Sequence, residues 1–289
     1  MREPDCVLLR MGESALKSEQ VQAKWDRILQ ENIKFALDAA GVKADIETNP
    51  NRVFIYTGQI YEAVKALQKV FGITSMSPAW MTQSKLDSIS NLATDVAKEV
   101  LLLSNQKSFA IRAHRAGMHG FTSKEVAEVA GAAVKRTTEA RVDLGKPEHE
   151  IEIEVRSRRS YVMVSRLQGP GGLPLGSGGK AIALIADESD LLSAWLIAKR
   201  GVELIVMATA GGTRFAINLK EWHAGKGMEV LPVRDFASAE KLAKEKGIIA
   251  ITSGEKTATK LKVKDLLVLR PLVGMTGKET AALSAFIKS

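Results

Sequence analysis

KSFAIRAHRAGMHGFTSKEV, residues 107–126, is the most informative stretch of this chain. Arg112 and Arg115 lie where an alternating strand pattern gives way to a glycine-containing loop. Thr122, followed three residues later by Glu125, has the capping-box pattern and predicts the start of a helix. Guanidinium groups fork onto phosphate oxygens, and a helix N-terminus offers free amides, so this loop has the chemistry to grip several phosphates. A solvated charged surface is the alternative.

A second group of arginines follows this helix. Two strand patterns, 151–156 and 161–165, flank the polar turn 157–160, and Arg156, Arg158 and Arg159 lie on this strand pair. If this strand pair is a neighbour of the first strand, the arginines of both segments share one basic face. The sequence leaves that adjacency open.

Composition and charge limit the class to which the protein can belong. The content of 45% hydrophobic and 26% charged residues is typical of a globular protein, and no apolar run approaches the roughly 18 residues of a membrane span. The short apolar run before Arg10 does not make a secretory signal, so we expect a cytoplasmic protein that does not bind a membrane. The net charge of +8 divides into −1 for residues 1–100, +4 for 101–166 and +5 for 167–289, which slightly favours a polyanionic partner.

Periodicity divides the chain into three units, which we place at residues 1–76, 77–168 and 169–289. The first has the order strand, helix, strand, strand, helix of a ferredoxin-like α+β unit, over residues 6–9, 18–40, 44–48, 53–57 and 60–70. The second is also α+β and begins with a helix at 86–103. The third alternates strands with helices, which favours a parallel sheet covered by helices. Its expected strands are 181–185, 202–208, 228–233, 248–252 and 266–269, and its expected helices are 191–199, 237–246 and 278–287.

GPGGLPLGSGGKA, residues 169–181, marks the predicted linker before the third unit. It is not a Walker loop, because Ala181 follows Lys180 and Pro174 stands where the first glycine is needed. It does not fit the dinucleotide fingerprint either, since its glycines do not follow a predicted strand. A structural linker is the favoured interpretation.

Acidic residues follow the first strand of the third unit. Asp187, Glu188 and Asp190 stand at a strand end, where ligands of open α/β sheets collect. Magnesium coordination and the capping of a helix N-terminus both explain such a cluster. The four histidines show no metal-ligand spacing with carboxylates, so no zinc site is expected. Cys6 is the only cysteine; it lies on a predicted core strand and leaves no disulfide or two-thiol relay within one chain.

Short ordered motifs run through nearly the whole chain. The most specific are FAIR at 109–112, RAG at 115–117, FTS at 121–123, VDL at 142–144 and GPGGLP at 169–174. The others are RMGE at 10–13, LKS at 16–18, FGI at 71–73, SP at 77–78, KRGVE at 199–203, SGE at 253–255 and LRPLVGM at 269–275. In this order they resemble the tRNA 4-thiouridine synthetase and thiamine-biosynthesis sulfurtransferase family, ThiI, with Met11 replacing the family's aromatic residue.

The resemblance implies a fold, a substrate and a reaction. It implies a ferredoxin-like N-terminal domain, a THUMP α/β domain and a reduced Rossmann-like PP-loop ATP-pyrophosphatase fold with a parallel sheet. In the family, the first two domains hold the tRNA acceptor stem and its CCA end, and the third adenylates a uridine that a cysteine persulfide then thiolates. We expect RNA contacts from Lys107, Arg112, Arg115, His119, Lys124, Arg156, Arg158, Arg159 and Lys180.

The third domain departs from the family where ATP is held. The family's S-G-G-x-D-S loop aligns with residues 186–191, where Asp190 matches and acidic residues replace both glycines that let amides approach pyrophosphate. The Q-rich segment that follows SGE is replaced by KTAT at 256–259, and no cysteine occurs in this domain. The expected vestigial nucleotide-binding positions are Leu184, Ile185, Asp190, Gly254 and Arg270.

We therefore expect a tRNA-binding protein whose PP-loop domain is inactive, without catalytic or metal-binding residues and without a cofactor. The alternative is an active ATP-dependent tRNA uridine 4-sulfurtransferase, linked or not to thiamine thiazole synthesis, that uses ATP, magnesium and sulfur from a partner protein. A scaffold that has lost both activities is the third hypothesis. Besides tRNA, a sulfur donor, a protein with an intact PP-loop and a second copy of this chain stay open as partners.

Overall fold

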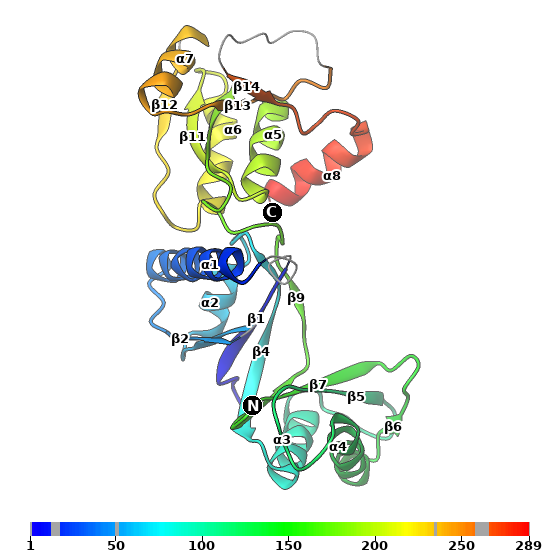
Figure 1. The fold of residues 1–289 in the computed structure, drawn as a ribbon. Helices are drawn as coiled ribbons and strands as arrows, with labels where there is room; N and C mark the ends of the chain where they lie inside the picture. The colour runs from blue at the N-terminus through cyan, green and yellow to red at the C-terminus, as the bar shows by residue number, and fades with distance from the viewer. Residues whose placement is uncertain (1, 13–17, 50–51, 234–235, 258–265, 289) are drawn as a thin grey trace. The chain divides into compact units, whose positions relative to one another are not determined.

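The computed structural model describes residues 2–12, 18–49, 52–233, 236–257 and 266–288 (Figure 1). The chain forms two compact units, the first made of residues 1–10, 43–64 and 75–168 and the second of 11–42, 65–74 and 169–289. The motif residues Glu13, Leu16, Lys17, Ala258 and Thr259 lie outside the described residues. The three-domain division at residues 76 and 168 remains a prediction.

A nine-stranded sheet runs through the first unit in the order β2-β3-β1-β4-β8-β7-β5-β6, with β9 paired to β4. Its strands are β1 (Cys6–Met11), β2 (Asp45–Asn49), β3 (Arg52–Tyr56), β4 (Ile73–Gln83), β5 (Ser108–Arg115), β6 (Arg141–Val142), β7 (His149–Val155), β8 (Arg159–Met163) and β9 (Leu167–Gln168). Two helices, α1 (Glu19–Ala39) and α2 (Ile60–Leu67), alternate with β1 to β4 along the chain. This gives the β-α-β-β-α-β order of a ferredoxin-like domain.

β4 was missed by the sequence pattern. Pro78 lies inside it and has no N–H to donate, which argues against a strand interior. The strand tolerates this proline because Ser75 and Met76 pair with β9 and residues 80–83 pair with β8, so Pro78 falls between the two pairings.

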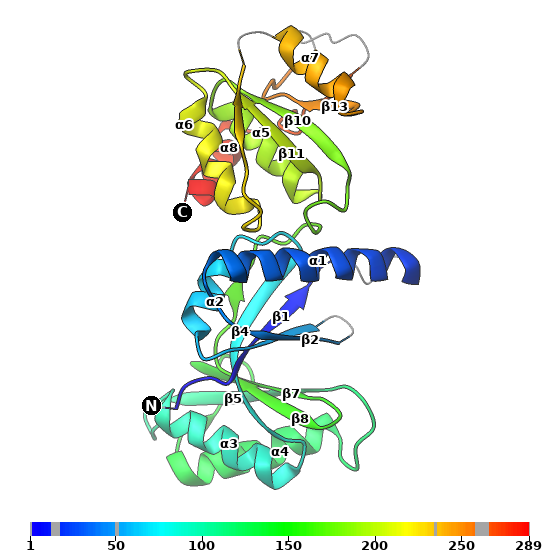
Figure 2. The same cartoon turned by 90° about the vertical axis from the view of Figure 1, so that its left-hand side faces the viewer.

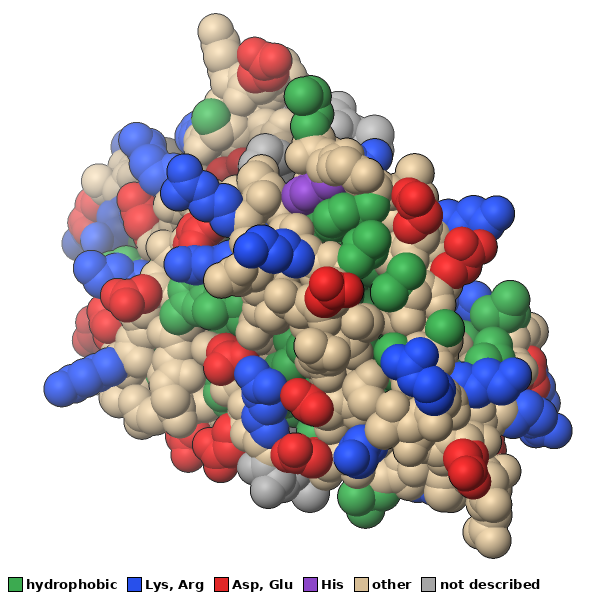
Figure 3. All heavy atoms as spheres, turned by 90° about the horizontal axis from the view of Figure 1, so that it is seen from below, with side chains coloured by type: hydrophobic (Ala, Val, Ile, Leu, Met, Phe, Trp, Pro, Cys, Tyr) green, Lys and Arg blue, Asp and Glu red, His purple; other side chains and the backbone are tan. Residues whose placement is uncertain are grey.

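α3 (Leu86–Glu99) and α4 (Ser123–Thr138) cover one face of β5, β7 and β8 (Figure 2). The buried side chains between these layers include Trp80, Leu92, Phe109, Val126, Ile151, Ile153 and Val162. The predicted capping box is confirmed: the amide of Glu125 donates to Thr122 Oγ1 at 3.2 Å, and the amide of Thr122 donates to Glu125 Oε2 at 2.7 Å. On the surface that carries α3 and α4, basic and acidic side chains intermingle (Figure 3), so these helices do not form a surface of one charge.

The second unit contains a five-stranded parallel sheet in the order β12-β11-β10-β13-β14, as the alternating pattern predicted. Its strands are β10 (Lys180–Ile185), β11 (Glu203–Ala208), β12 (Val230–Pro232), β13 (Ala250–Thr252) and β14 (Leu267–Leu269). Besides α1 and the end of α2, its helices are α5 (Glu188–Lys199), α6 (Thr213–Ala216), the 3-10 helix Ile217–Trp222, α7 (Phe236–Glu245) and α8 (Gly277–Lys288). Ala181, Ala183 and Ile185 belong to the core cluster that includes residues of α5, α6 and α8, whereas Ile182 belongs to the cluster that includes residues of α7. Among the described residues, no helix is both long and apolar enough to cross a membrane.

The predicted linker is a closely packed segment. The amide of Gly169 donates to the carbonyl of Thr74 at 2.9 Å, and that of Gly171 donates to the carbonyl of Ile73 at 2.8 Å. A Cβ at Gly169 would lie 2.3 Å from the carbonyl oxygen of Ile73, and one at Gly172 would lie 2.2 Å from that of Lys199. Glycine is therefore needed at both positions for close backbone approach.

Candidate nucleic-acid interface

The two arginine segments of the first unit are neighbours. β5 and β7 pair in parallel, with Arg112 opposite Glu152 and Arg115 opposite Val155. The amide of Ala116 then donates to the carbonyl of Val155 at 2.9 Å. The loop after β5 and the turn between β7 and β8 therefore lie at the same edge of the sheet, and the adjacency that the sequence left open is present.

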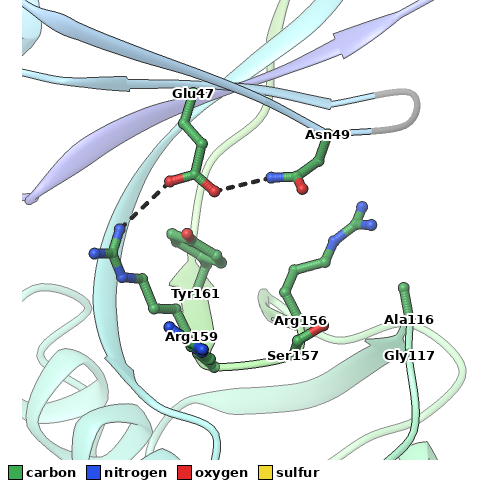
Figure 4. Close-up of a pocket in the computed structure, with 9 residues that line it drawn as sticks. Glu47, Asn49, Ala116, Gly117, Arg156, Ser157, Arg159 and Tyr161 are labelled. Atoms are coloured by element: carbon green, nitrogen blue, oxygen red, sulfur yellow. Dashed lines mark hydrogen bonds and ion pairs between the residues drawn. The ribbon is translucent and has the colours of Figure 1, made fainter.

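A cavity of about 590 Å³ opens at this edge (Figure 4). Arg156, Arg158 and Arg159, where β7 turns into β8, line it together with Glu47 and Asn49 from β2, and Figure 4 shows the guanidinium of Arg159 reaching Glu47. Ala116 and Gly117 close one side.

The three arginines differ in how they are held. Arg159 donates to the Tyr56 hydroxyl at 3.1 Å and to Glu47 at 3.5 Å, and its guanidinium lies over the Tyr56 ring. The hydrogen bond to Tyr56 raises the pKa of Arg159, so this group stays charged. Arg156 donates to Glu154 at 2.9 Å, whereas the side chain of Arg158 has no hydrogen bond or ion pair within the described part of the chain. Arg158 is therefore the most available anion-binding group, and Arg159, whose side chain is 49% exposed against 21% for Arg156, is the more accessible of the other two.

A second cavity, of about 490 Å³, is lined by Arg112, His114, Ser123 and Lys124 among others. Arg112 donates to Glu150 at 3.0 Å and to the carbonyl of Leu144 at 2.8 Å. The Lys124 side chain is 84% exposed and approaches Glu128 at 3.7 Å, a pair that solvent screens strongly. In this cavity Arg112 is thus committed, and Lys124 is the most available charge.

The other expected RNA-contacting residues are distributed more widely. Arg115 donates to the carbonyl of Gly117 at 3.0 Å, and His119 lies 3.3 Å from the carbonyl of Ala116, so both shape the loop beside the first cavity. Lys107 precedes β5, at the opposite end of that strand, and donates to the carbonyl of Leu101 at 3.0 Å. Lys180 begins β10 in the second unit and approaches Glu203 at 3.8 Å.

Sequence reasoning missed an ion-pair network on the face of β7 that α3 and α4 leave open. Its carboxylates are Glu152 and Glu154, which are held by Arg10 and Arg166 and by Arg52 and Arg156, respectively. Burial alone raises the pKa of Glu154, but the two arginines outweigh it and hold the pKa below its ordinary value. The alternation HEIEIEV at 149–155 was the available signal, because it places three glutamates on one strand face that needs cationic partners.

Cys6 is buried in the core of the first unit, as predicted from its strand. Its Sγ lies 3.9 Å from the carbonyl oxygen of Ala79. Burial, with a smaller effect from Asp5, raises the pKa of this thiol to about 12. Because the thiolate is the nucleophilic form, this environment does not suit a sulfur carrier.

The expected nucleotide-binding positions of the second unit lie together at the carboxyl end of β10. Asp190 accepts from the amides of Gly254 at 2.9 Å and Ala186 at 3.1 Å. Arg270 donates to Glu255, the neighbour of Gly254, at 3.1 Å. Ile185 is buried and Leu184 is partly buried at the end of the strand. A Cβ at Gly254 would lie 2.4 Å from the carbonyl carbon of Ser189, so the approach to α5 requires glycine.

The donor set at this strand end does not fit a pyrophosphate. Asp187 caps α5 by accepting from the amide of Asp190 at 3.1 Å, and Glu188 is held by Ser284 at 2.5 Å and by Lys288. Burial raises the pKa of Asp190, and the nearby Asp187 adds to this shift. The carboxylates of Asp187 and Asp190 thus occupy the positive end of the helix, where a phosphate would otherwise bind. Within the described residues, no group of three or more His, Cys, Asp or Glu side chains is arranged to hold a metal ion.

The chain matches family models over residues 6–165 and known proteins over nearly its whole length. Residues 6–77 match the ThiI ferredoxin-like domain, and residues 83–165 match the THUMP domain. A probable tRNA sulfurtransferase of Methanothermobacter thermautotrophicus is 30% identical, over 97% of this chain and 84% of that protein. This chain belongs to the tRNA sulfurtransferase family.

Other members of the tRNA sulfurtransferase family are longer than this chain. The Pyrobaculum aerophilum tRNA sulfurtransferase is 33% identical, over 95% of this chain and 65% of that protein. The probable tRNA sulfurtransferase of Methanobrevibacter smithii is 35% identical, over 70% of this chain and 53% of that protein. The match to this chain therefore spans about half to two thirds of these two relatives.

Two solved structures share the fold of this family member. PH1313 from Pyrococcus horikoshii superposes with a TM-score of 0.88 at 25% identity, over 98% of this chain and 99% of that chain. A 4-thiouridine synthetase in complex with RNA and ATP superposes with a TM-score of 0.79 at 22% identity, over 99% of this chain and 85% of that chain. The expected fold class, with a ferredoxin-like domain, a THUMP domain and a parallel PP-loop-like sheet, is confirmed.

Proposed function

We propose that this protein binds tRNA through its ferredoxin-like and THUMP domains, recognising the acceptor stem and the CCA end, and that its PP-loop-like domain does not use ATP. The observation that carries the proposed tRNA binding is the cavity beside Arg156, Arg158 and Arg159. It lies at the end of the sheet where the loop after β5 begins. Exposed arginines at one edge suit the phosphates of a nucleic acid, to which charged contacts supply most of the affinity. The 4-thiouridine synthetase that shares this fold was solved in complex with RNA, which supports RNA as the polyanion.

Binding assays with intact and shortened tRNA test the first half. The full chain is expected to bind intact tRNA and to lose most of its affinity when the CCA end is removed, because contacts to the unpaired end disappear while the duplex phosphates remain. The measurement is a titration at several salt concentrations, with heparin as a non-nucleic polyanion in parallel. Equal affinity for intact tRNA, shortened tRNA and heparin would reduce the interaction to unspecific charge attraction.

Calorimetry with magnesium and ATP tests the second half. No saturable binding is expected below about 1 mM ATP, which corresponds to a binding free energy of about 4 kcal/mol, because the carboxylates of Asp187 and Asp190 stand at the start of α5 and repel the phosphates. The control is a ThiI-family protein with its glycine loop intact, titrated under the same conditions. Saturable micromolar binding by this chain would favour the alternative, an active tRNA sulfurtransferase that takes sulfur from a partner.

A further inference from the structure

The second unit has a groove of about 400 Å³ where β10 and β13 begin. Its lining consists of the start of β10 with the glycines before it, the segment that enters β13, and single residues of the neighbouring strands: Gly178, Gly179, Lys180, Ala181, Val202, residues 246–250 and Leu269. The expected nucleotide-binding positions lie at the carboxyl end of β10. The groove is therefore separate from them.

Both charged side chains that line this groove are lysines. Lys180 is 58% exposed, and its Nζ lies 3.8 Å from Glu203 Oε1, a pair that solvent screens strongly. Lys246 is exposed just after the last turn of α7, and it has no hydrogen bond or ion pair within the described part of the chain. The lining contains no carboxylate. Its positive charge therefore favours an acidic ligand.

Aliphatic surface is exposed beside these lysines. Ile249 lines the groove and is 74% exposed, and Leu267 of β14 is 61% exposed. The two residues are neighbours, because the amide of Leu267 donates to the carbonyl of Ile249 at 2.8 Å. The lining has neither an arginine, which would fork onto phosphates, nor an aromatic ring, on which bases would stack. This surface thus fits apolar and acidic side chains of a protein better than RNA.

β14 offers an open strand edge next to the groove. It is the last strand in the order of the parallel sheet, and no strand pairs with its outer side among the residues that the structure describes. The amide of Leu267 faces β13, and so does the carbonyl of Leu269, which accepts from the amide of Ser253 at 2.9 Å. Because successive residues of a strand point their backbone groups to opposite sides, Val268 directs its N–H and C=O away from β13. Such an edge is a template for an added strand.

We propose that β14 and the adjoining groove bind an extended acidic segment of a partner protein. The segment pairs its backbone with Val268, packs apolar side chains on Leu267 and Ile249, and places a carboxylate near Lys246. β14 has only three residues, so the contact is short and the complex dissociates readily. The proposal does not rest on tRNA binding, because it concerns other residues in the other unit.

Titration of the full chain with short peptides tests this proposal. The probes are capped hexapeptides in which valine alternates with glutamate, with serine or with lysine, and a uridine tetranucleotide that carries the same three negative charges as the glutamate peptide. The glutamate peptide is expected to bind at least about tenfold more tightly than the lysine peptide and more tightly than the serine peptide. It should also bind more tightly than the tetranucleotide.

Two variants separate the charge from the strand edge. Lys246→Glu should weaken binding of the glutamate peptide about fivefold, whereas Lys98→Glu, the same change at an exposed position of α3, should change it less than about twofold. Val268→Pro removes the outward N–H and should also weaken binding about fivefold. In the wild-type chain, hydrogen exchange of the Val268 amide, measured by NMR, should slow when the glutamate peptide is bound. Thermal melting checks that each variant is folded.

The remaining outcomes overturn the proposal. Equal binding of the glutamate, serine and lysine peptides, or no binding of any of them, removes the acidic partner. Unchanged exchange of the Val268 amide in the bound state removes strand addition, even if Val268→Pro does not fold. A tetranucleotide that binds as tightly as the glutamate peptide and is weakened by Lys246→Glu alone makes the groove a nucleic-acid site. None of these results alters the test of tRNA binding with intact and shortened tRNA.

Discussion

Replacing Arg158 and Arg159 together by alanine is expected to weaken tRNA binding at least about 100-fold near 0.1 M salt. The reason is the loss of two charge-assisted contacts to phosphate, each of which contributes about 1.5–3 kcal/mol. The dependence of log K on log salt should also become shallower, by about 1.4–1.8, because two fewer counterions are released. Titration of labelled tRNA with wild type and variant over a salt series measures both quantities.

The matched control removes two positive charges from the same unit. Lys135 and Arg136 lie in the last turn of α4, whereas the helix begins beside the loop that follows β5. Their replacement by alanine changes the net charge equally and should weaken binding by less than about threefold, the residual effect of a screened distant charge. If both double variants lose affinity to the same extent, binding follows overall charge and the cavity at the sheet edge has no special part in it.

Local signals in the sequence predicted local structure well. The capping box at Thr122 and Glu125 formed as expected, because its two hydrogen bonds join residues three positions apart. The parallel sheet of the second unit followed from its alternation of apolar runs and helices. β4 was missed because Pro78 interrupts it and because its pairing partners, β8 and β9, are remote in the sequence.

The acceptor that each arginine binds could not be predicted from the sequence. Arg112, Arg115 and Arg156 looked equivalent as basic residues, yet each is committed to a different acceptor. Glu47 lies 112 residues from Arg159 and had no motif to mark it, so its place in the cavity could only come from the fold. Charge patterns therefore located the edge of the sheet that carries the cavity but did not separate structural arginines from available ones.

The partners of the glutamates of β7 could not be predicted from the sequence either. Removing one of these partners is expected to have a large effect on stability. Arg10 donates to Glu152 at 2.8 Å and to Ser77 Oγ at 2.8 Å, and its side chain is only 9% exposed. Burial lowers the pKa of this arginine, and Glu152 opposes the shift. Arg166 binds the same carboxylate at 2.9 Å but is 44% exposed. The carboxylate of Glu152 thus has one buried and one exposed arginine partner, so the contributions of the two ion pairs to stability can be compared directly.

Arg10→Ala is expected to lower the free energy of unfolding by about 3–5 kcal/mol, because it leaves Glu152 in a poorly solvated position without its buried partner. Arg166→Ala should cost only about 0–1 kcal/mol, since water replaces the exposed guanidinium. Urea unfolding measured by circular dichroism gives both values, and hydrogen exchange of β1 and β7 shows whether the loss of stability is local.

The double variant Arg10→Met with Glu152→Leu should recover most of the stability, because apolar residues of similar volume remove the buried unpaired charge. Equal costs for Arg10→Ala and Arg166→Ala, or a double variant as unstable as Arg10→Ala, would show that the buried ion pair does not hold β1 against the glutamate face of β7.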